Sequence, residues 1–291
     1  MQTFIQLGAT ALQIGAVYIL FSLGLTLIFG VMRIVNFVHG HIFAVAALIV
    51  AYILPPLAAG GLSAPVAYVL ASIAGIAVAL GLGALLYFFG FRYFQRDLVG
   101  SFILSIGFVL LLDGVLLHLF GGAVRGVPEI FPGRVSIAGA QITVQRLFLC
   151  AVALVMAGVL YWALGHTRLG KALRAVSYDH EAAMMVGVPY ARIAFLGFMI
   201  ASLLAAIAGV LLAPVTIVSP VIGTDYLIKG FIAVIIGGLG SVPGAILGSL
   251  FVASIETFGS YYLDSSYATL AIFGMVIVVL LFWPKGVLGR G

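Results

Sequence analysis

Charge-free stretches long enough to cross a membrane recur along the whole chain. Each runs for about 17–25 residues, the length that an α-helix needs to span roughly 30 Å of hydrocarbon. Of the 291 residues, 64% are hydrophobic and only 7% are charged, whereas about a quarter of a soluble domain is charged. No polar stretch is large enough to fold as a soluble domain. We therefore expect residues 1–291 to form one all-α, polytopic transmembrane bundle.

The apolar stretches predict about nine spans, at residues 7–31, 42–57, 64–89, 99–120, 147–165, 193–213, 226–237, 243–260 and 266–283. Basic residues are enriched in the cytoplasmic loops of membrane proteins. The basic clusters are Arg92 with Arg96, Arg168 with Lys171, Arg174 and Arg192, and Lys285 with Arg290. They place the C-terminus on the cytoplasmic side, so that nine crossings put the N-terminus outside and make residues 121–146 the main external loop.

Two segments, one in each half, interrupt the apolar pattern. The first, FGVMRIVNFVHGHIF at 29–43, carries polar residues between two glycines, and the second includes GGLGSVPGA at 237–245, with four glycines and one proline in nine residues. A continuous helix does not accommodate such a composition. Interrupted helices in both halves are the sequence sign of a transport path near the bilayer midplane. The expected hinges are Gly30, Gly40, Gly237, Gly238, Gly240 and Pro243, and the expected pathway residues are Asn36, His39, His41, Ser219 and Lys229.

Three charged residues lie within predicted spans, where such residues are expensive and indicate function or pairing. Lys229 either reaches the interface or faces a cavity and pairs with an acid, for which Asp225 has the right helical spacing. Asp113 has no partner that the sequence can name, and Glu256 is expected at the external boundary. Because His39 and His41 have no third ligand nearby, no metal site is predicted.

One polar segment, RAVSYDHEAAMMVGVPYAR at 174–192, stands out within the longest cytoplasmic loop, at about 166–192. Asp179 is suited to cap a helix of about eight residues, and Gly187 is suited to end it. Ala182, Met185 and Val186 then share one face. This face either docks a partner or lies against the bundle of the same chain.

The sequence EAAMMVG resembles the EAA-x3-G loop of ATP-binding-cassette (ABC) importer permeases, the coupling helix that fits a groove on the ATPase subunit. Four stretches resemble, in order, the Liv-type branched-chain amino acid permeases, the LivH-like more than the LivM-like ones: GLTLIFGVMRIVNFVHGHIF, TRLGKALRAVSYDHEAAMMVGVPYARI, SPVIGTDYLIKGFIAVIIGGLGSVPGAILGSLFVASIE and WPKGVLG. The resemblance implies that Asp179, Glu181, Ala182, Ala183, Met185 and Gly187 form the ATPase contact.

The resemblance also implies a transport subunit without enzymatic activity, in the cytoplasmic membrane of a bacterium or archaeon. Its implied partners are two ATPases that carry ATP and Mg²⁺, an extracytoplasmic binding protein and a second permease, either LivM-like or another copy of this chain. The implied cargo is a branched-chain amino acid, or a related small amino acid or amide. The chain departs from the family pattern at His41, where an acid is usual, and at Trp283, where arginine is usual.

No G-x-x-x-x-G-K-[ST] phosphate loop is present, so this chain is expected to bind no cofactor of its own. The chain also lacks a basic stripe with interleaved aromatics, so no nucleic-acid partner is expected. A self-sufficient channel or an ion-coupled carrier for a small solute is the alternative function. Paired intramembrane carboxylates would favour that alternative, and the sequence shows only isolated ones at Asp113 and Glu256.

Overall fold

Long apolar helices dominate the structure, a computed structural model that describes residues 2–137 and 139–289. The helices are α1 (Gln2–Met32), α2 (His39–Ala59), α3 (Ala64–Phe89), α4 (Leu98–Phe120), α5 (Val144–His166), α6 (Arg168–Tyr178), α7 (His180–Met185), α8 (Tyr190–Leu212), α9 (Ile222–Gly237), α10 (Val242–Tyr262) and α11 (Ser265–Phe282). A single 3-10 turn, η1 (Phe91–Tyr93), lies between α3 and α4.

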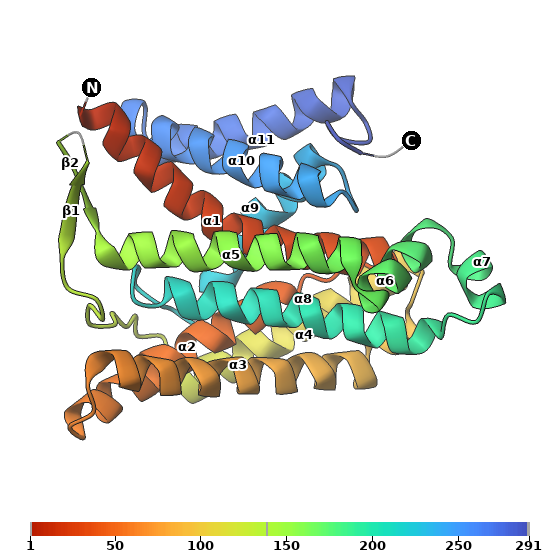
Figure 1. Ribbon diagram of the computed structural model, residues 1–291, viewed down its shortest axis with the longest axis horizontal. Coiled ribbons are helices and arrows are strands. Elements are labelled where there is room, and N and C mark those ends of the chain that lie inside the picture. Colours follow the sequence, from red (N-terminus) through yellow and green to blue (C-terminus); the bar gives the residue numbers. More distant parts are fainter. Residues whose placement is uncertain (1, 138, 290–291) are drawn as a thin grey trace.

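Nine of these helices account for the expected crossings. Eight helices within the described residues are long and apolar enough to span a membrane. α9 has 16 residues and is therefore about 24 Å long, short of the hydrocarbon thickness. The two termini nevertheless lie at opposite ends of the bundle, the C-terminus at the end that carries α6 and α7 (Figure 1). An even number of crossings would bring both termini to one side, so α9 supplies the ninth. We call the end with α6 and α7 cytoplasmic because it carries the basic clusters.

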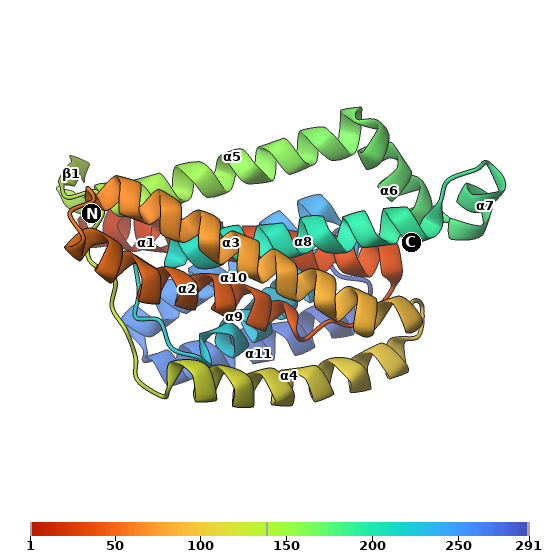
Figure 2. The same cartoon turned by 90° about the horizontal axis from the view of Figure 1, so that it is seen from below.

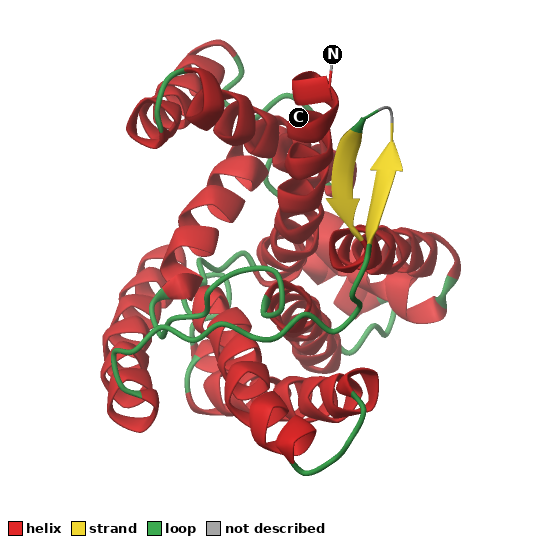
Figure 3. Ribbon diagram, turned by 90° about the vertical axis from the view of Figure 1, so that its left-hand side faces the viewer, coloured by secondary structure: helices red, strands yellow, loops and turns green. Residues whose placement is uncertain are grey.

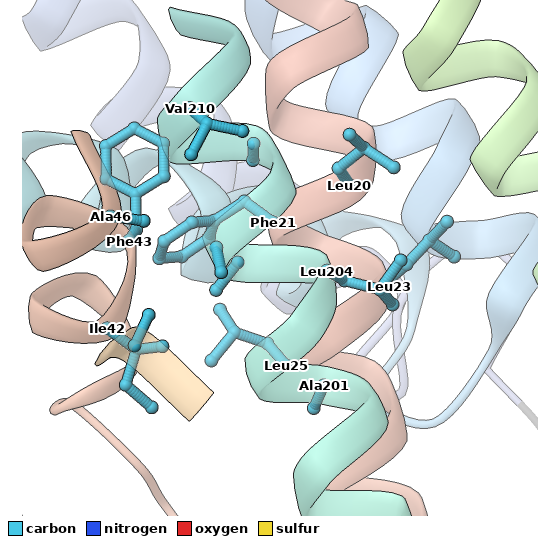
Figure 4. Close-up of a cluster of buried hydrophobic side chains, with 14 of the residues drawn as sticks. Leu20, Phe21, Leu23, Leu25, Ile42, Phe43, Ala46, Ala201, Leu204 and Val210 are labelled. Carbon is cyan, nitrogen blue, oxygen red and sulfur yellow. The ribbon is translucent and has the colours of Figure 1, made fainter. Parts of the chain in front are cut away.

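The helices form an inner and an outer group. The most apolar part of α1 is 83% buried and that of α8 is 67% buried, whereas those of α4 and α11 are 17% buried. Phe21 of α1, Phe43 of α2 and Leu204 of α8 meet in the central apolar cluster (Figure 4). Along the outside, α3, α4, α5 and α11 expose large apolar side chains, as lipid-facing helices do. Figure 2 shows α4 and α5 on opposite sides of the bundle.

The external end carries a small β-hairpin that the sequence did not predict. Strands β1 (Arg134–Ile137) and β2 (Ala140–Thr143) pair antiparallel just before α5. The irregular loop at residues 121–133 crosses this end of the bundle (Figure 3). Within that loop, Arg125 pairs with Val218 through two backbone hydrogen bonds of 2.9 and 2.8 Å. The transmembrane part is all-α, as expected, and the strands are confined to the external loop.

Candidate functional site

The cytoplasmic loop at about 166–192 contains two short helices, α6 and the six-residue α7, where one helix of about eight residues was predicted. Asp179 starts α7, because its Oδ1 accepts hydrogen bonds from the backbone N–H groups of Glu181 (3.0 Å) and Ala182 (3.1 Å). Such a cap satisfies donors that the first turn leaves free. Gly187, with φ +86°, ends the helix, and its N–H donates to the carbonyl of Met184 at 3.0 Å. Local hydrogen bonds therefore fix both ends of α7.

α7 presents an apolar face to solvent. Met185 and Val186 are 89% and 80% exposed, and Ala182 beside them is also exposed. Ala183 points the other way and is buried against the core. α7 protrudes beyond the bundle in Figures 1 and 2. Large apolar side chains gathered on a protruding helix mark a site of contact with another molecule.

The first interruption is the non-helical segment at residues 33–38, between α1 and α2. It opens with Arg33, whose φ of +50° lies in the left-handed region. Residues outside the segment form hydrogen bonds with backbone groups that have no partner at the break. The N–H of Arg96 donates to the last carbonyl of α1 at 3.0 Å, and the Oγ of Ser101 accepts from the N–H of Val35 at 3.2 Å. Irregular backbone at membrane depth requires such partners.

The two glycines expected to interrupt the first segment, Gly30 and Gly40, lie on either side of the break. Gly30 lies within α1 and Gly40 within the first turn of α2, so neither is in the break itself. A Cβ on Gly40 would lie 2.5 Å from the carbonyl oxygen of Gly223 in α9, and a Cβ on Gly223 would overlap the carbonyl of Gly40. At the cytoplasmic end, a Cβ on Gly30 would lie 3.8 Å from the Cα of Gly240. These glycines allow the two interrupted segments to approach each other at two depths.

The second interruption lies where the sequence predicted it. Gly237 is the last residue of α9, and the turn that follows contains Gly238 and Gly240 with φ of +105° and +83°. Pro243 lies in the first turn of α10, a position that needs no N–H donor. Gly238, Gly240 and Pro243 therefore each suit the backbone conformation at their position.

The C-terminal segment caps α9, a contact that could not be predicted from the sequence. The N–H of Val287 donates to the carbonyl of Ile236 at 2.8 Å, and the N–H of Leu288 donates to the carbonyl of Gly237 at 3.0 Å. The last carbonyls of a helix have no partner within the helix. The segment that contains WPKGVLG thus satisfies two of them and holds the end of α9 in place.

The five expected pathway residues occupy three places. Asn36, His39 and His41 lie in and just after the first break, Ser219 lies half-buried in the loop between α8 and α9, and Lys229 lies in α9. Asn36 is 2% exposed, and its side-chain oxygen and nitrogen have no hydrogen-bond partner among the described residues. The ring of His39 is buried edge-on against Phe21, with 4.8 Å between ring centroids.

His41 pairs with Asp113, which the sequence left without a partner. The Nε2 of His41 and the Oδ1 of Asp113 are 2.9 Å apart, and the two side chains are 3% and 31% exposed. The pair joins α2 to α4, whose spans are far apart in the sequence. His41 stands where the family usually carries an acid, and in this chain it faces the acid Asp113.

Lys229 pairs with Glu256 of α10, and not with Asp225 as helical spacing suggested. Tyr18 of α1 donates its hydroxyl to the second oxygen of the same carboxylate at 2.5 Å. The side chains of Lys229 and Glu256 are 27% and 20% exposed, so the pair is mostly enclosed. This three-helix cluster corrects the expectation that Glu256 is an isolated carboxylate. Within residues 2–137 and 139–289, no group of three His, Cys, Asp or Glu side chains is arranged to hold a metal ion.

Comparison with known proteins places these features in a family. Residues 9–281 match the family model described as "Branched-chain amino acid transport system / permease component". The chain is 32% identical over 300 residues to the high-affinity branched-chain amino acid transport system permease protein BraD of Pseudomonas aeruginosa, covering 99% of this chain and 96% of BraD. It is 28% identical over 295 residues to LivH, the corresponding permease protein of Escherichia coli K12, with 99% and 96% coverage.

A solved structure supports the fold. It is described as "An inward-facing conformation of a putative metal-chelate type ABC transporter", with a TM-score of 0.51 and 19% identity over 94% of this chain and 85% of the other. This likeness concerns the fold alone. The relatives are transport permease subunits and not enzymes. The resemblance drawn from the motifs is confirmed, and the chain belongs to the permease family of the branched-chain amino acid ABC transporters.

Proposed function

We propose that this chain is the membrane-spanning permease of an ATP-driven importer for branched-chain amino acids, or for related small amino acids or amides. ABC permeases act with ATPase subunits and, in import, with a substrate-binding protein. For this chain we infer two ATPase subunits that carry ATP and Mg²⁺, an extracytoplasmic binding protein, and a second permease that is either LivM-like or a second copy. The assembly would lie in the cytoplasmic membrane of a bacterium or archaeon.

In this proposal residues 1–291 act as a single permease domain with three working regions. The ATPase contact is Asp179, Glu181, Ala182, Ala183, Met185 and Gly187. The transport path includes Asn36, His39, His41, Ser219 and Lys229. The regions that bend are those around Gly30 and Gly40 and around Gly237, Gly238, Gly240 and Pro243.

The exposed apolar face of α7 is the observation that carries the proposal. Burying a methionine or valine side chain contributes about 1.5–3 kcal/mol, which corresponds to about a tenfold to hundredfold change in affinity. The caps at Asp179 and Gly187 hold this face in one conformation before a partner binds, so little ordering entropy is lost on docking. An ABC permease needs a rigid, protruding contact of this kind to receive force from its ATPases.

Replacing Met185 by glutamate tests the proposal. We expect the variant to insert and fold normally, to lose about tenfold or more of its affinity for the ATPase subunits, and to lose ATP-dependent uptake. Val287→Glu is the matched control, since Val287 is a 54% exposed apolar residue at the same end of the protein and outside α7. Copurification from detergent gives the first readout and uptake into proteoliposomes the second. Full ATPase binding by Met185→Glu would overturn the assignment of α7.

A further inference from the structure

A groove lies between α9 and α11. Its volume is about 220 Å³, and it is lined by Asp225 and Lys229 of α9, Thr269 of α11 and apolar side chains from both helices. Pockets for drug-sized ligands are about 300–1,000 Å³. The groove therefore has room for a small solute only.

The groove lies between the first turns of α9 and α11 and is closed below by an apolar layer. Asp225 lies in the first turn of α9, and Thr269 lies four residues after Ser265, at the external start of α11. At 1.5 Å per residue, Thr269 is about 6 Å below that end. Deeper in the groove, Ile232 and Ile272 are 5% and 2% exposed and belong to one apolar cluster that joins α9 to α11. A solute that enters from outside would stop at this layer.

The charges around the groove do not balance. Glu256 neutralises Lys229 and also accepts the hydroxyl hydrogen of Tyr18. Asp225 is exposed to the groove and makes no hydrogen bond or ion pair with another described residue. Two carboxylates and one ammonium group leave one uncompensated negative charge beside the hydrocarbon, where ionised groups are paired or face water.

A primary ammonium group supplies the missing positive charge. Asp225 and Lys229 are one helical turn apart, so their Cβ atoms are about 5–6 Å apart on one face of α9. An α-amino acid fits between them, with its ammonium group on Asp225 and its carboxylate on Lys229. Its side chain then lies against the apolar wall that includes Ile228 and Phe273.

We propose that the α9–α11 groove is the external entrance of the transport path and that Asp225 binds the ammonium group of the entering amino acid. This assignment rests on the proposed transport function and narrows its cargo to solutes with a primary ammonium group, which excludes neutral amides. Lys229 positions the carboxylate end of the same solute and keeps its bond to Glu256.

Thiol labelling tests the groove without requiring transport. In a Cys150→Ser background, which removes the one native cysteine, Thr269→Cys places a thiol in the groove and Leu270→Cys places one at the same depth on the outer face of α11, where Leu270 is 66% exposed. A membrane-impermeant maleimide is added outside right-side-out vesicles that contain the assembled complex. We expect Thr269→Cys to react and Leu270→Cys to remain unlabelled. Equal labelling of the two would overturn the groove as an aqueous entrance.

Protection from labelling tests the ligand chemistry. We expect leucine and 3-methylbutylamine, which keep the ammonium group, to slow labelling of Thr269→Cys, and 4-methylpentanoate, which lacks it, to have no effect. Adding Asp225→Asn should abolish protection and Asp225→Glu should retain it. Protection by 4-methylpentanoate, or protection that survives Asp225→Asn, would overturn the role of Asp225.

Failure of the groove and failure of the transport proposal give different results. The ATPase subunits should copurify with Asp225→Asn as with the wild type, because α7 is unchanged. If the wild type failed to bind ATPases while protection still depended on Asp225, the ammonium site at Asp225 would stand, and its role as an entrance to ATP-driven transport would fall with the transport proposal. If ATPase binding held and protection were absent, only the groove would fall.

Discussion

Replacing Glu256 by glutamine removes the charge that balances Lys229 and nearly preserves the shape of the side chain. Removing one partner of a buried ion pair costs about 3–5 kcal/mol, and a lysine at the bilayer centre costs about 2.5–3.5 kcal/mol on insertion scales. The side chains of Lys229 and Glu256 are 27% and 20% exposed, so water compensates part of this cost. We therefore expect Glu256→Gln to lower the free energy of unfolding by about 2–3 kcal/mol.

Removing both charges should cost less than removing one. Polar pairs in a membrane protein contribute about 0.6 kcal/mol on average when measured by double-mutant cycles. The large cost of Glu256→Gln comes instead from the lysine left without a partner. Adding Lys229→Met should therefore recover most of the lost stability, whereas two independent sites would add their costs.

Unfolding in mild detergent, titrated with a denaturing detergent and followed by circular dichroism, measures all three variants. Glu181→Gln is the control for the carboxylate-to-amide change, because Glu181 is exposed on α7 and has no ion-pair partner among the described residues. A Glu256→Gln protein within about 0.5 kcal/mol of wild type, the usual limit of additivity, would refute the reasoning. Simple addition of the costs of the two single variants would refute it as well.

Other parts of the structure give three further tests. His41→Asp would place a second carboxylate against Asp113. Two carboxylates about 4 Å apart repel by about 4 kcal/mol at an effective dielectric constant near 20. The same detergent titration should show a large loss of stability, and the exchange His41→Asp with Asp113→His should restore it. Gly223→Val should sharply reduce the yield of monodisperse protein, because the contact with α2 has no room, while Gly81→Val, which has open space, should be tolerated; equal yields would contradict this close contact. Val287→Pro removes an N–H that caps α9 and should cost about 1 kcal/mol in thermal stability measurements; no loss would mean that the cap is unimportant.

The spans were predictable because the length and charge of a segment decide whether it crosses a membrane. The second break was predictable for a similar local reason, since Gly238 and Gly240 have the positive φ that glycine adopts readily. The requirement for an odd number of crossings identified the short helix α9 as a span, which its length of 16 residues alone would not have done. In each case the deciding information lies within one segment.

The partners of the intramembrane charges could not be predicted from one segment. Helical spacing favoured Asp225 for Lys229, but the packing of α9 against α10 brings Glu256 closer. Asp113 meets His41 only because α2 and α4 are neighbours in space. The first break lies between the predicted spans, but the role of its glycines depends on packing. Position 40 requires glycine because α9 packs directly against it, and not because a helix ends there.

α6 joins the exposed helix α7 to both interrupted segments. Ser177 of α6 lies beside the end of α1, where a Cβ on Gly30 would be 3.3 Å from its Oγ. Ser177 and Gly240 also line two adjoining cavities of about 290 and 460 Å³ at the cytoplasmic end. Only Asp179 separates α6 from α7, so a displacement of α7 acts directly on α6. Coupling through a protein requires such contiguous contacts. The first consequence of ATPase movement should therefore be at Gly30 and Gly240, next to these cavities, and the outer groove at Asp225 should respond only after α9 has moved.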